Sequence, residues 1–551
     1  ARNKKFNRKS EFLYQDAELL SAISNYAAGS YQYPQDKINS GWHTILLNQF
    51  HDILPGTSIK EVYEDSKNDY KKVLNDGNQL VNLAIDNIAK NVDLDSISAI
   101  VFNQLSFNRT DIVEFELPQG LNLQDLNNIE IYDCSGKLVA SQITRQNQNS
   151  GSSYNSCTSH NKVMFLAENV PAKGYKTYKI KKAADTSASS DNCKLKVSAL
   201  SLENDFFDIK LDSTANIVSI YDKANDRQVL KAGEKANVFQ AFEDKPHLWD
   251  AWDINIYYQE KMWEVNNVES VEVLEQGPVR ASIRVKKKFL DSTITQDIQI
   301  YNFIPRIDFV TNIDWKEKQI LLKTAFPVDI HTDKATYEIQ YGNVERPTHW
   351  NTSWDYARFE VCAHKWADLS EDAYGVSLLN DCKYGYDIKD STMRLSLLKS
   401  ATYPNEDADK EKHEFTYSLY PHQGDWKNSG TVQMAYSINC PMYVKVEEKH
   451  AGNMPSEFSM VKSNCENVII EVVKKAEDTD DIIVRVYECY NRRTKACLEF
   501  FKELDKVFEC DLMEKALCSV KCDGNKFEYE IKPYEIKTFR IRVNKSTNIN
   551  C

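Results

Sequence analysis

The sequence predicts a multidomain protein in which a bundle of three helices is followed by mostly antiparallel β-sandwich domains. The chain has 551 residues, a length that corresponds to about three or four domains. Apolar residues recur at helical spacing through residues 6–93 and at every second position from about residue 96 onward. Strand and helix patterns do not alternate, which favours antiparallel over parallel sheets.

Three helices are expected within the first 95 residues. The first spans about Asn7–Ala28 and stops at a glycine. The second follows Pro34 and continues to about Leu54, and the third begins at Ser58. The short connections between these helices are typical of an up-down-up bundle.

The remainder of the chain reads as β-strands. In the stretch FFDIKLDSTANIVSIYD, residues Phe207, Ile209 and Leu211 alternate with polar residues, and a turn precedes a second alternating run. Two polar stretches, Arg145–His160 and Ala183–Asn192, are expected to be loops or linkers. We therefore expect four domains: a helical bundle at 1–95, a small β domain at 96–187, a large β-sandwich at 188–440 and a C-terminal β domain at 441–551.

The composition argues against several classes of partner. The net charge is -13, which disfavours nucleic acid and anionic membranes. The lysine run Lys286–Lys288 lies in a strand-like segment and is expected to form a solvated strand face. No stretch has the length of a membrane span. The 13 cysteines are scattered and form no CxxC pair, so free thiols in a reducing cytoplasm are expected.

The stretch LLNQFHDILPGTS places His51 beside Asp52 near the end of the second helix, just before a Pro-Gly pair. On a helical wheel these two residues share a polar sector with Thr44 and Asn48. The apolar arc of the helix contains Trp42, Ile45, Leu46, Leu47, Phe50, Ile53 and Leu54. The polar sector is either a solvated helix face or a place where His51 ligates a divalent ion, which needs three or four ligands in all.

Longer motifs carry a resemblance to a known family. The segment NQFHDILPGTSIKEVYEDSKNDY is similar to the helical-domain motif of glycoside hydrolase family thirty-eight, the retaining α-mannosidases. The resemblance continues in NRKSEFLYQDAELLSA, FEDKPHLWDAWDINIYY, ERPTHWNTSWDYARFEVCAHKWADLS, GVSLLNDCKYGYD and HEFTYSLYPH. The subgroup is the cytosolic and bacterial type, and the central sandwich is expected to resemble the supersandwich of galactose mutarotases.

The resemblance implies roles for the pair near the end of the second helix. His51 corresponds to a ligand of the catalytic zinc, and Asp52 to a residue that contacts the bound mannose. Cobalt or manganese would suit one imidazole as well. In this family a nucleophile and a general acid/base perform retaining hydrolysis of α-mannosides.

Both catalytic carboxylates belong to an N-terminal α/β domain that no part of this chain resembles. We therefore expect a truncated chain that holds no catalytic carboxylate, is inactive alone, and depends on that missing domain as its partner. A homo-oligomer is also compatible with the family.

A second group of candidates lies in the segment HLWDAWD. Trp249, Asp250, Trp252 and Asp253 combine flat apolar rings with carboxylates, which is what sugar rings need for binding. The alternative is a packed loop with buried indoles. The His331–Asp333 segment has the HxD pattern of a metal site, but its strand-like setting favours a strand-end or turn feature.

Two other functions remain open at this stage. A non-catalytic carbohydrate-binding or scaffold protein built from β-sandwiches would have no need of His51. A mutarotase-like enzyme would need a histidine and a glutamate that converge in the sandwich cleft, and the sequence identifies no such pair.

Overall fold

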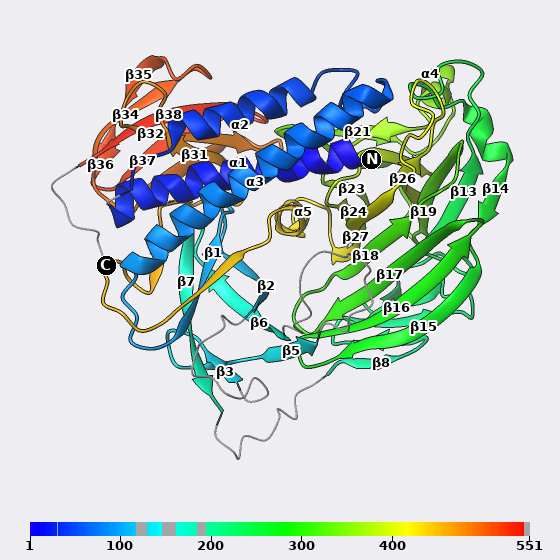
Figure 1. Ribbon diagram of the computed structural model, residues 1–551, viewed down its shortest axis with the longest axis horizontal. Coiled ribbons are helices and arrows are strands. Elements are labelled where there is room, and N and C mark those ends of the chain that lie inside the picture. The colour runs from blue at the N-terminus through cyan, green and yellow to red at the C-terminus, as the bar shows by residue number, and fades with distance from the viewer. Residues whose placement is uncertain (30, 117–128, 146–160, 184–193, 545–551) are drawn as a thin grey trace. The chain divides into compact units, whose positions relative to one another are not determined.

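A computed structural model of the chain describes residues 1–29, 31–116, 129–145, 161–183 and 194–544 (Figure 1). A helical N-terminal segment precedes a long series of strands, and every strand pair in the described part of the chain is antiparallel, which confirms the predicted fold class. Most of the two expected linkers lies outside the described residues.

The contacts divide the chain into two units, and neither is continuous in sequence. Unit 1 contains residues 1–12, 42–74 and 193–439, and unit 2 contains residues 13–41, 75–192 and 440–551. The four predicted domain ranges stay predictions. No helix in the described part of the chain is both long and apolar enough to cross a membrane.

The three expected helices are present, with different bounds. Helix α1 (Arg2–Ile23) continues as a π-helical turn, η1 (Ser24–Ala28), which ends where Gly29, at φ 75°, donates its N–H to the carbonyl of Ser24. Helix α2 (Gln35–Asn48) begins after Pro34, as expected. It ends six residues before the expected Leu54, which corrects the sequence prediction. Helix α3 (Lys60–Asn91) starts two residues later than expected.

The helix segments of unit 1 make polar contacts with residues far away in sequence. The guanidinium of Arg8, on α1, is buried and donates to Tyr384 Oη at 3.0 Å and to Asn439 Oδ1 at 3.0 Å. The central carbon of this guanidinium, Cζ, also lies 4.4 Å from the centroid of the Tyr384 ring. These contacts fasten the start of α1 to the β part of unit 1.

Three sheets form the β part of unit 1. The largest has nine strands, in the order β15 (Asn267–Gln276), β16 (Arg280–Phe289), β17 (Ser292–Tyr301), β18 (Ile307–Asp314), β27 (Lys412–Gln423), β24 (Tyr374–Asn380), β23 (Trp366–Ser370), β20 (Lys334–Ile339) and β21 (Gly342–Pro347). The six-stranded sheet has the order β14 (Met262–Glu264), β13 (Val238–Glu243), β19 (Ile320–Pro327), β26 (Thr392–Lys399), β25 (Gly385–Lys389) and β22 (Val361–Cys362). The third has the order β12 (Arg227–Gln228), β11 (Ile217–Asp222), β10 (Phe207–Leu211), β9 (Ser201–Glu203) and β8 (Lys196–Ser198).

One hydrophobic core joins these three sheets, as expected of a sandwich. It contains Phe239 of β13, Phe309 of β18 and Leu395 of β26, all almost fully buried. The predicted hairpin is confirmed, because β10 pairs with β11 and its Phe207, Ile209 and Leu211 are buried in alternation with polar residues. Short helices η2 (Ile256–Glu260), α4 (Ser353–Ala357) and α5 (Thr431–Asn439) complete the unit.

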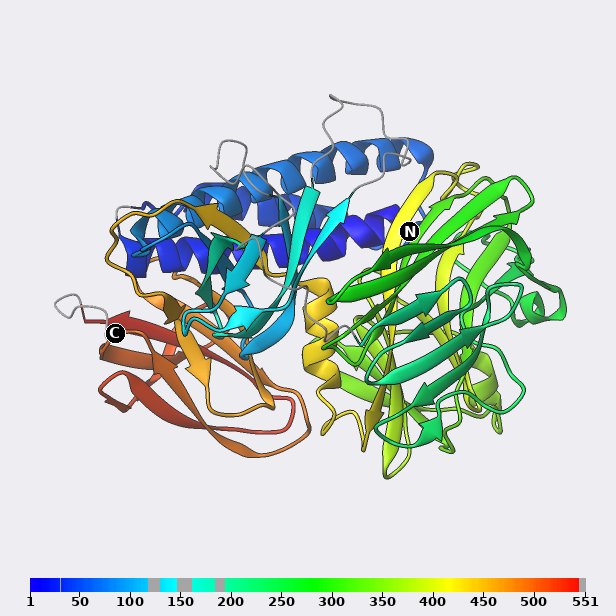
Figure 2. The same ribbon diagram turned by 90° about the horizontal axis from the view of Figure 1, so that it is seen from below.

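Two further details of unit 1 bear on function. Helix α5 packs against β23 and β24 of the nine-stranded sheet (Figure 2). The expectation of a solvated lysine face on β16 is wrong for one residue: Lys287 is buried and donates to Asn216 Oδ1 at 2.7 Å. Burial lowers the pKa of Lys287 to about 8.

The described residues of unit 2 form four smaller sheets. One contains β28 (Tyr443–Glu447), β1 (Ser98–Asn103), β7 (Gly174–Lys182), β3 (Ile129–Tyr132) and β4 (Leu138–Val139), with β29 (Glu457–Ser459) beside β7. A second contains β2 (Arg109–Glu116), β6 (Asn161–Val170) and β5 (Ser141–Arg145). The third contains β30 (Val461–Ser463), β33 (Thr494–Phe500), β37 (Lys526–Ile531) and β36 (Cys522–Asp523). The fourth contains β31 (Val468–Lys475), β32 (Ile482–Glu488), β38 (Ile536–Val543), β34 (Leu504–Cys510) and β35 (Ala516–Val520).

A buried carboxyl lies among the helix residues of unit 2. Asp16, on α1, accepts a hydrogen bond from Tyr443 Oη at 3.0 Å and a weak one from the Cys440 thiol. Burial raises the pKa of Asp16 to about 7, although the nearby Lys173 and Arg109 charges oppose the shift. The carboxyl therefore changes its charge near neutral pH.

Candidate functional site

The residues between α2 and α3 form a turn that carries the predicted pair; we call residues 49–57 the site loop. Pro55 disfavours a helical conformation at the residue before it, Leu54, so a helix cannot continue through this point. The loop winds through i→i+3 hydrogen bonds, such as Phe50 N–H to the carbonyl of Leu47 at 3.2 Å and Ile53 N–H to that of Phe50 at 2.9 Å. His51 and Asp52 thus stand on a turn and not on a helix, which corrects the expected setting.

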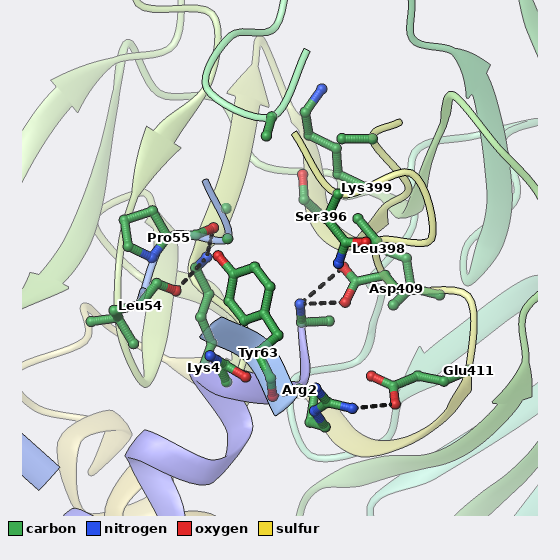
Figure 3. A pocket seen from close by; sticks show the side chains of 18 of the residues that line it. Arg2, Lys4, Leu54, Pro55, Tyr63, Ser396, Leu398, Lys399, Asp409 and Glu411 are labelled. Carbon is green, nitrogen blue, oxygen red and sulfur yellow. Dashed lines mark hydrogen bonds and ion pairs between the residues drawn. The ribbon is translucent and has the colours of Figure 1, made fainter. Parts of the chain in front are cut away.

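Several side chains from α1 and α3 hold the site loop in place. Lys4 Nζ donates to the carbonyls of Leu54, at 3.3 Å, and Pro55, at 2.7 Å (Figure 3). Tyr63 Oη donates to the carbonyl of Asp52 at 3.1 Å and accepts from the N–H of Ser58 at 2.9 Å. These partners satisfy backbone carbonyls of the loop that no helix hydrogen bond uses.

Within the site loop the two predicted residues lie side by side. His51 Nε2 is 3.1 Å from Asp52 Oδ2, and the side chains are 77% and 35% exposed. Thr57 Oγ1 donates to the other carboxylate oxygen of Asp52 at 2.9 Å, which fixes that side chain. Among the described residues, His51 contacts this carboxylate and the Phe50 ring, whose centroid lies 4.2 Å away.

The donor atoms of this pair fit a divalent ion in type and spacing. Two ligands that lie about 2.1 Å from an ion, at tetrahedral or right angles, are about 3.0–3.4 Å apart, and the observed separation is 3.1 Å. A site of three or four ligands is not complete, however, because no third metal-ligating group joins these two among the described residues. The pair would therefore form one part of a larger site.

Four apolar side chains close to the pair in sequence are open to solvent. Leu46, Leu47, Phe50 and Ile59 are each more than half exposed. Asn48, which the helical wheel assigns to the polar sector, is instead buried and donates to Asp69 Oδ2 at 3.1 Å. The wheel therefore gives the wrong burial for this last turn of α2, and an apolar surface beside His51 is left open to solvent.

A pocket of about 520 Å³ in unit 1 adjoins the site loop (Figure 3). Leu54, Pro55 and Gly56 line it, together with Ala251 of the HLWDAWD segment and Ile254 directly after it. Both segments therefore reach this pocket, but the predicted site residues themselves (His51, Asp52, Trp249, Asp250, Trp252 and Asp253) do not line it.

The second segment presents its tryptophans to solvent, contrary to the alternative of buried indoles. Trp249 is 61% exposed and Trp252 is 48% exposed, and their rings meet edge to face with centroids 5.9 Å apart. Trp249 has φ 61°, a left-handed conformation that is costly for a bulky residue. Asp253 is exposed, whereas Asp250 Oδ2 accepts from the Thr402 N–H at 2.7 Å and so anchors the segment.

A charged network that the sequence analysis missed lies in the sheet behind this segment. Lys323 Nζ, fully buried on β19, binds Asp387 Oδ2 at 2.7 Å and the carboxylate of Glu360. Arg394 donates to the other oxygen of Asp387 at 2.9 Å, and Tyr258 Oη lies 3.4 Å from Asp387. A lysine within the apolar run QILLKTAF was the available signal, since a buried lysine needs carboxylate partners.

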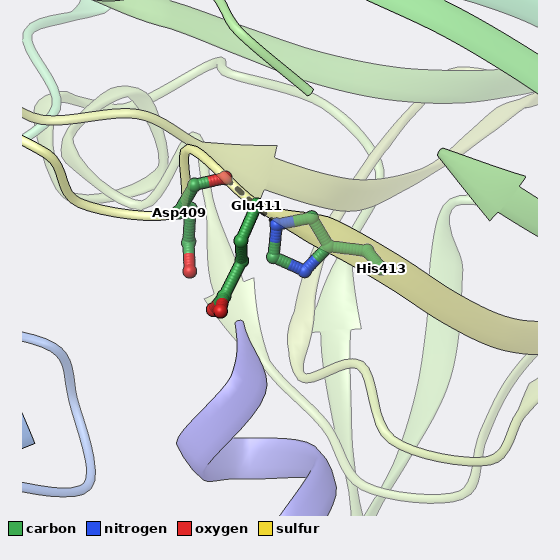
Figure 4. Close-up of side chains that lie close together, drawn as sticks. All are labelled: Asp409, Glu411 and His413. Carbon is green, nitrogen blue, oxygen red and sulfur yellow. Dashed lines mark hydrogen bonds between the residues drawn. The ribbon is translucent and has the colours of Figure 1, made fainter. Parts of the chain in front are cut away.

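Three further groups lie close enough together to hold a metal ion. Ligand atoms of Asp409, Glu411 and His413 lie within 4.8 Å of one another (Figure 4). Two of the three are already engaged, however: Glu411 binds Arg2 at 2.7 Å, and His413 Nε2 donates to the Asp409 carbonyl at 2.7 Å. Burial lowers the pKa of His413 to about 4.

The sequence signal for this group was its i, i+2, i+4 spacing before a strand, which the sequence analysis did not use. The HxD segment at His331–Asp333 lies between β19 and β20, in the connecting position that was expected.

Comparisons with known proteins define the class to which this fold and site belong. Residues 1–88 match the middle domain of α-mannosidases, residues 202–407 the C-terminal domain of glycosyl hydrolases family 38, and residues 467–539 the C-terminal β-sandwich domain of the same family. The chain is thus built from glycosyl hydrolase domains. It belongs to glycosyl hydrolase family 38.

Curated relatives extend over nearly the whole chain. It is 31% identical to α-mannosidase G of Dictyostelium discoideum over 98% of the chain and 51% of that protein. It is 30% identical to human α-mannosidase 2C1 over 94% of the chain and 46% of that protein, and 30% identical to an α-mannosidase of Saccharomyces cerevisiae over 98% and 47%. The chain spans about half the length of the curated relatives it matches.

Among solved structures, an α-mannosidase from Enterococcus faecalis has the same fold. The TM-score is 0.81 at 18% sequence identity, and the match covers 98% of this chain and 67% of the other.

Proposed function

We propose that this chain forms the middle and C-terminal part of a metal-dependent α-mannosidase. The complete enzyme would release terminal α-linked mannose from oligosaccharides or small mannosides by a retaining mechanism. The observation that carries the proposal is the His51–Asp52 pair, which stands exposed on an anchored turn in a chain whose relatives are named α-mannosidases. Their greater length is consistent with a catalytic domain outside these 551 residues.

In this proposal each residue of the pair has one role. His51 offers the Nε2 lone pair to a divalent ion, zinc first and cobalt or manganese as alternatives. Asp52 accepts a hydrogen bond from a mannose hydroxyl while Thr57 keeps its carboxylate in place. When bound, the ion would act as a Lewis acid on the sugar hydroxyls. The nucleophile and the general acid/base come from the other domain, so this chain alone would be inactive.

The surroundings of the pair support a site shared between this chain and a separate catalytic domain. The exposed Leu46, Leu47, Phe50 and Ile59 offer an apolar surface on which the catalytic domain would dock. The exposed rings of Trp249 and Trp252 would cover the apolar face of the α-mannoside, with Asp253 as an acceptor for its hydroxyls. Asp250 would contribute mainly by anchoring this segment.

We also propose that the enzyme works in the cytoplasm and assembles as a homo-oligomer. None of the ten cysteines in the described part of the chain forms a disulfide, which agrees with a reducing compartment. Free Cys134, Cys362 and Cys518 are exposed and would be the first to react in an oxidising one.

The test of the metal role is His51→Ala in the complete enzyme. The matched control is His43→Ala, because His43 is also an exposed histidine but lies on α2, outside the site loop. Metal content and hydrolysis of p-nitrophenyl α-mannoside should fall together in the first variant and stay unchanged in the second. Unchanged metal content in His51→Ala would remove it from the ligand set and favour the non-catalytic binding or scaffold alternative.

The sugar contact is tested separately with Asp52→Asn. This change keeps the size of the side chain and should lower kcat/KM by about 10²-fold or more while metal remains bound. Wild-type activity in this variant would refute the contact.

A further inference from the structure

One part of the site loop borders a cavity. Leu54, Pro55 and Gly56 line the pocket of about 520 Å³, and none of the three is fully buried. Close packing on all sides normally fixes the position of a segment, and an open pocket offers no packing contacts on its side. The position of residues 54–56 therefore depends strongly on hydrogen bonds to their backbone.

One ammonium group supplies two of these hydrogen bonds. Lys4, in the first turns of α1, donates from Nζ to the carbonyl of Pro55 at 2.7 Å and to that of Leu54 at 3.3 Å (Figure 3). Hydrogen bonds from a charged donor are roughly twice as strong as neutral ones. Because each peptide group is planar, a single nitrogen that holds two successive carbonyls fixes the orientation of both peptide groups.

Lys4 is dedicated to these two carbonyls. Among the described residues it has no carboxylate partner, and its hydrogen bonds are the two to the site loop. Burial lowers the pKa of Lys4, although the charge of Asp409 opposes the shift. An ammonium group that is partly removed from water needs compensating acceptors. The carbonyls of the site loop are those acceptors, so the side chain acts through the loop and not through an ion pair.

The position of the two carbonyls bears directly on the donor atoms of the pair. The residues that Lys4 holds lie between Asp52 and Thr57, and Thr57 Oγ1 donates to the Asp52 carboxylate at 2.9 Å. A shift of the intervening residues would stretch this bond or turn the carboxylate. Either change would alter the spacing of 3.1 Å between His51 Nε2 and Asp52 Oδ2.

We propose that Lys4 is a positioning residue for the metal site. It holds the site loop in the conformation in which His51 and Asp52 present their donor atoms together, and it acts only through the two carbonyls. This inference deepens the proposed mannosidase function and rests on it, because the metal role of His51 belongs to that proposal.

The experiment measures the dissociation constant for zinc in variants of the complete enzyme. Lys4→Met keeps an apolar stem of similar length but removes the donors, and the dissociation constant should rise about tenfold. The matched control is Lys5→Met, because Lys5 is the neighbouring residue on α1 and donates to the carbonyl of Glu414 at 2.7 Å, outside the site loop. It should bind zinc like the wild type.

Two further variants separate positioning from stability. Lys4→Arg supplies charged donors for both carbonyls and should restore most of the affinity. Arg306→Met breaks the buried pair with Asp308, at 2.7 Å, and neither residue lines the pocket. It should lower the stability of unit 1 and leave the affinity for zinc unchanged. The visible absorption bands of the cobalt-loaded enzyme, which depend on ligand geometry, should change in Lys4→Met alone.

The outcomes distinguish this inference from the proposed function. Wild-type affinity for zinc and an unchanged cobalt spectrum in Lys4→Met would overturn the positioning role, as would equal losses of affinity in Lys4→Met and Arg306→Met. Loss of zinc in His51→Ala together with full affinity in Lys4→Met would refute the positioning role and leave the proposed function intact. Full affinity in His51→Ala would refute both. If Lys4→Met does not fold by circular dichroism, Lys4→Gln, which is uncharged and one bond shorter, decides in its place.

Discussion

The replacement Lys323→Met should destabilise unit 1 strongly although the two side chains have similar length. Lys323 Nζ is fully buried between Asp387 and Glu360, and the change leaves both carboxylates without their shared cation. Burial opposes ionisation of Asp387, but the charges of Lys323 and Arg394 outweigh it and hold the pKa of this carboxyl below its usual value. Loss of the Lys323 charge therefore affects the carboxylates of Asp387 and Glu360 together.

The magnitude follows from the partners that remain. Removal of one member of a buried ion pair costs about 3–5 kcal/mol. Asp387 keeps its bond to Arg394 at 2.9 Å, and Glu360 keeps the hydroxyl of Ser396, so we expect the lower end, about 3 kcal/mol. The additional change Glu360→Gln removes one orphaned charge and should restore about 1–2 kcal/mol.

Urea denaturation followed by tryptophan fluorescence measures this cost. With an m-value of about 3 kcal/mol per molar for a unit of this size, the midpoint should fall by about 1 M. The pKa of Asp387 is lowered in the folded protein, so its stabilisation is present above the unfolded pKa of about 3.9 and is lost as pH falls below it. The difference between variant and wild type should therefore shrink near pH 4.

The matched control is Lys334→Met, which breaks an exposed pair with Glu345 and should shift the midpoint by little. Equal midpoints for Lys323→Met and the wild type at pH 7 would refute the argument that the buried network stabilises unit 1.

Two more outcomes can be tested. The change Asp16→Asn removes the titration of a carboxyl whose pKa is raised to about 7. The free energy of unfolding of the wild type falls as pH rises from about 4 to 7, so thermal melts should shift in favour of the variant by up to about 4 kcal/mol over that range. A difference between the two proteins that does not depend on pH would contradict the argument from burial. Tyr63→Phe removes the hydroxyl that bonds to the Asp52 carbonyl and the Ser58 N–H. The free energy of unfolding measured in urea should fall by about 1–3 kcal/mol, and metal binding by the complete enzyme should weaken about tenfold. The control Tyr257→Phe, at an exposed site, should change neither quantity.

Local patterns in the sequence were sufficient for the fold class. The change from helical spacing to alternation near residue 95 is followed by β1 at Ser98, and the two alternating runs within 207–222 pair as a hairpin. Both depend on which side chains face a core, and that information is contained in neighbouring residues. Lys287 departs from the pattern because its partner Asn216 is 71 positions away.

The end of α2 could not be derived from periodicity. The apolar pattern continues to Leu54, but the helix stops at Asn48, and carbonyls of the loop that follows are bound by Lys4 and Tyr63 from other helices. Those partners become neighbours only in the folded chain. The same holds for Lys323, whose carboxylate partners Asp387 and Glu360 lie 64 and 37 positions away in the sequence.

The contacts of Arg8 also have a consequence for the order in which the newly synthesised chain folds. This residue finds its partner Asn439 only after 431 further residues have been synthesised. At about 5–20 residues per second this takes roughly 20–90 s. Until Tyr384 and Asn439 have been made, the guanidinium of Arg8 lacks both of these partners, although Lys4 of the same helix can already contact the site loop. Ribosome-bound chains that end before residue 439 should therefore be preferred clients of chaperones that hold amphipathic segments, and chains that extend past it should be released.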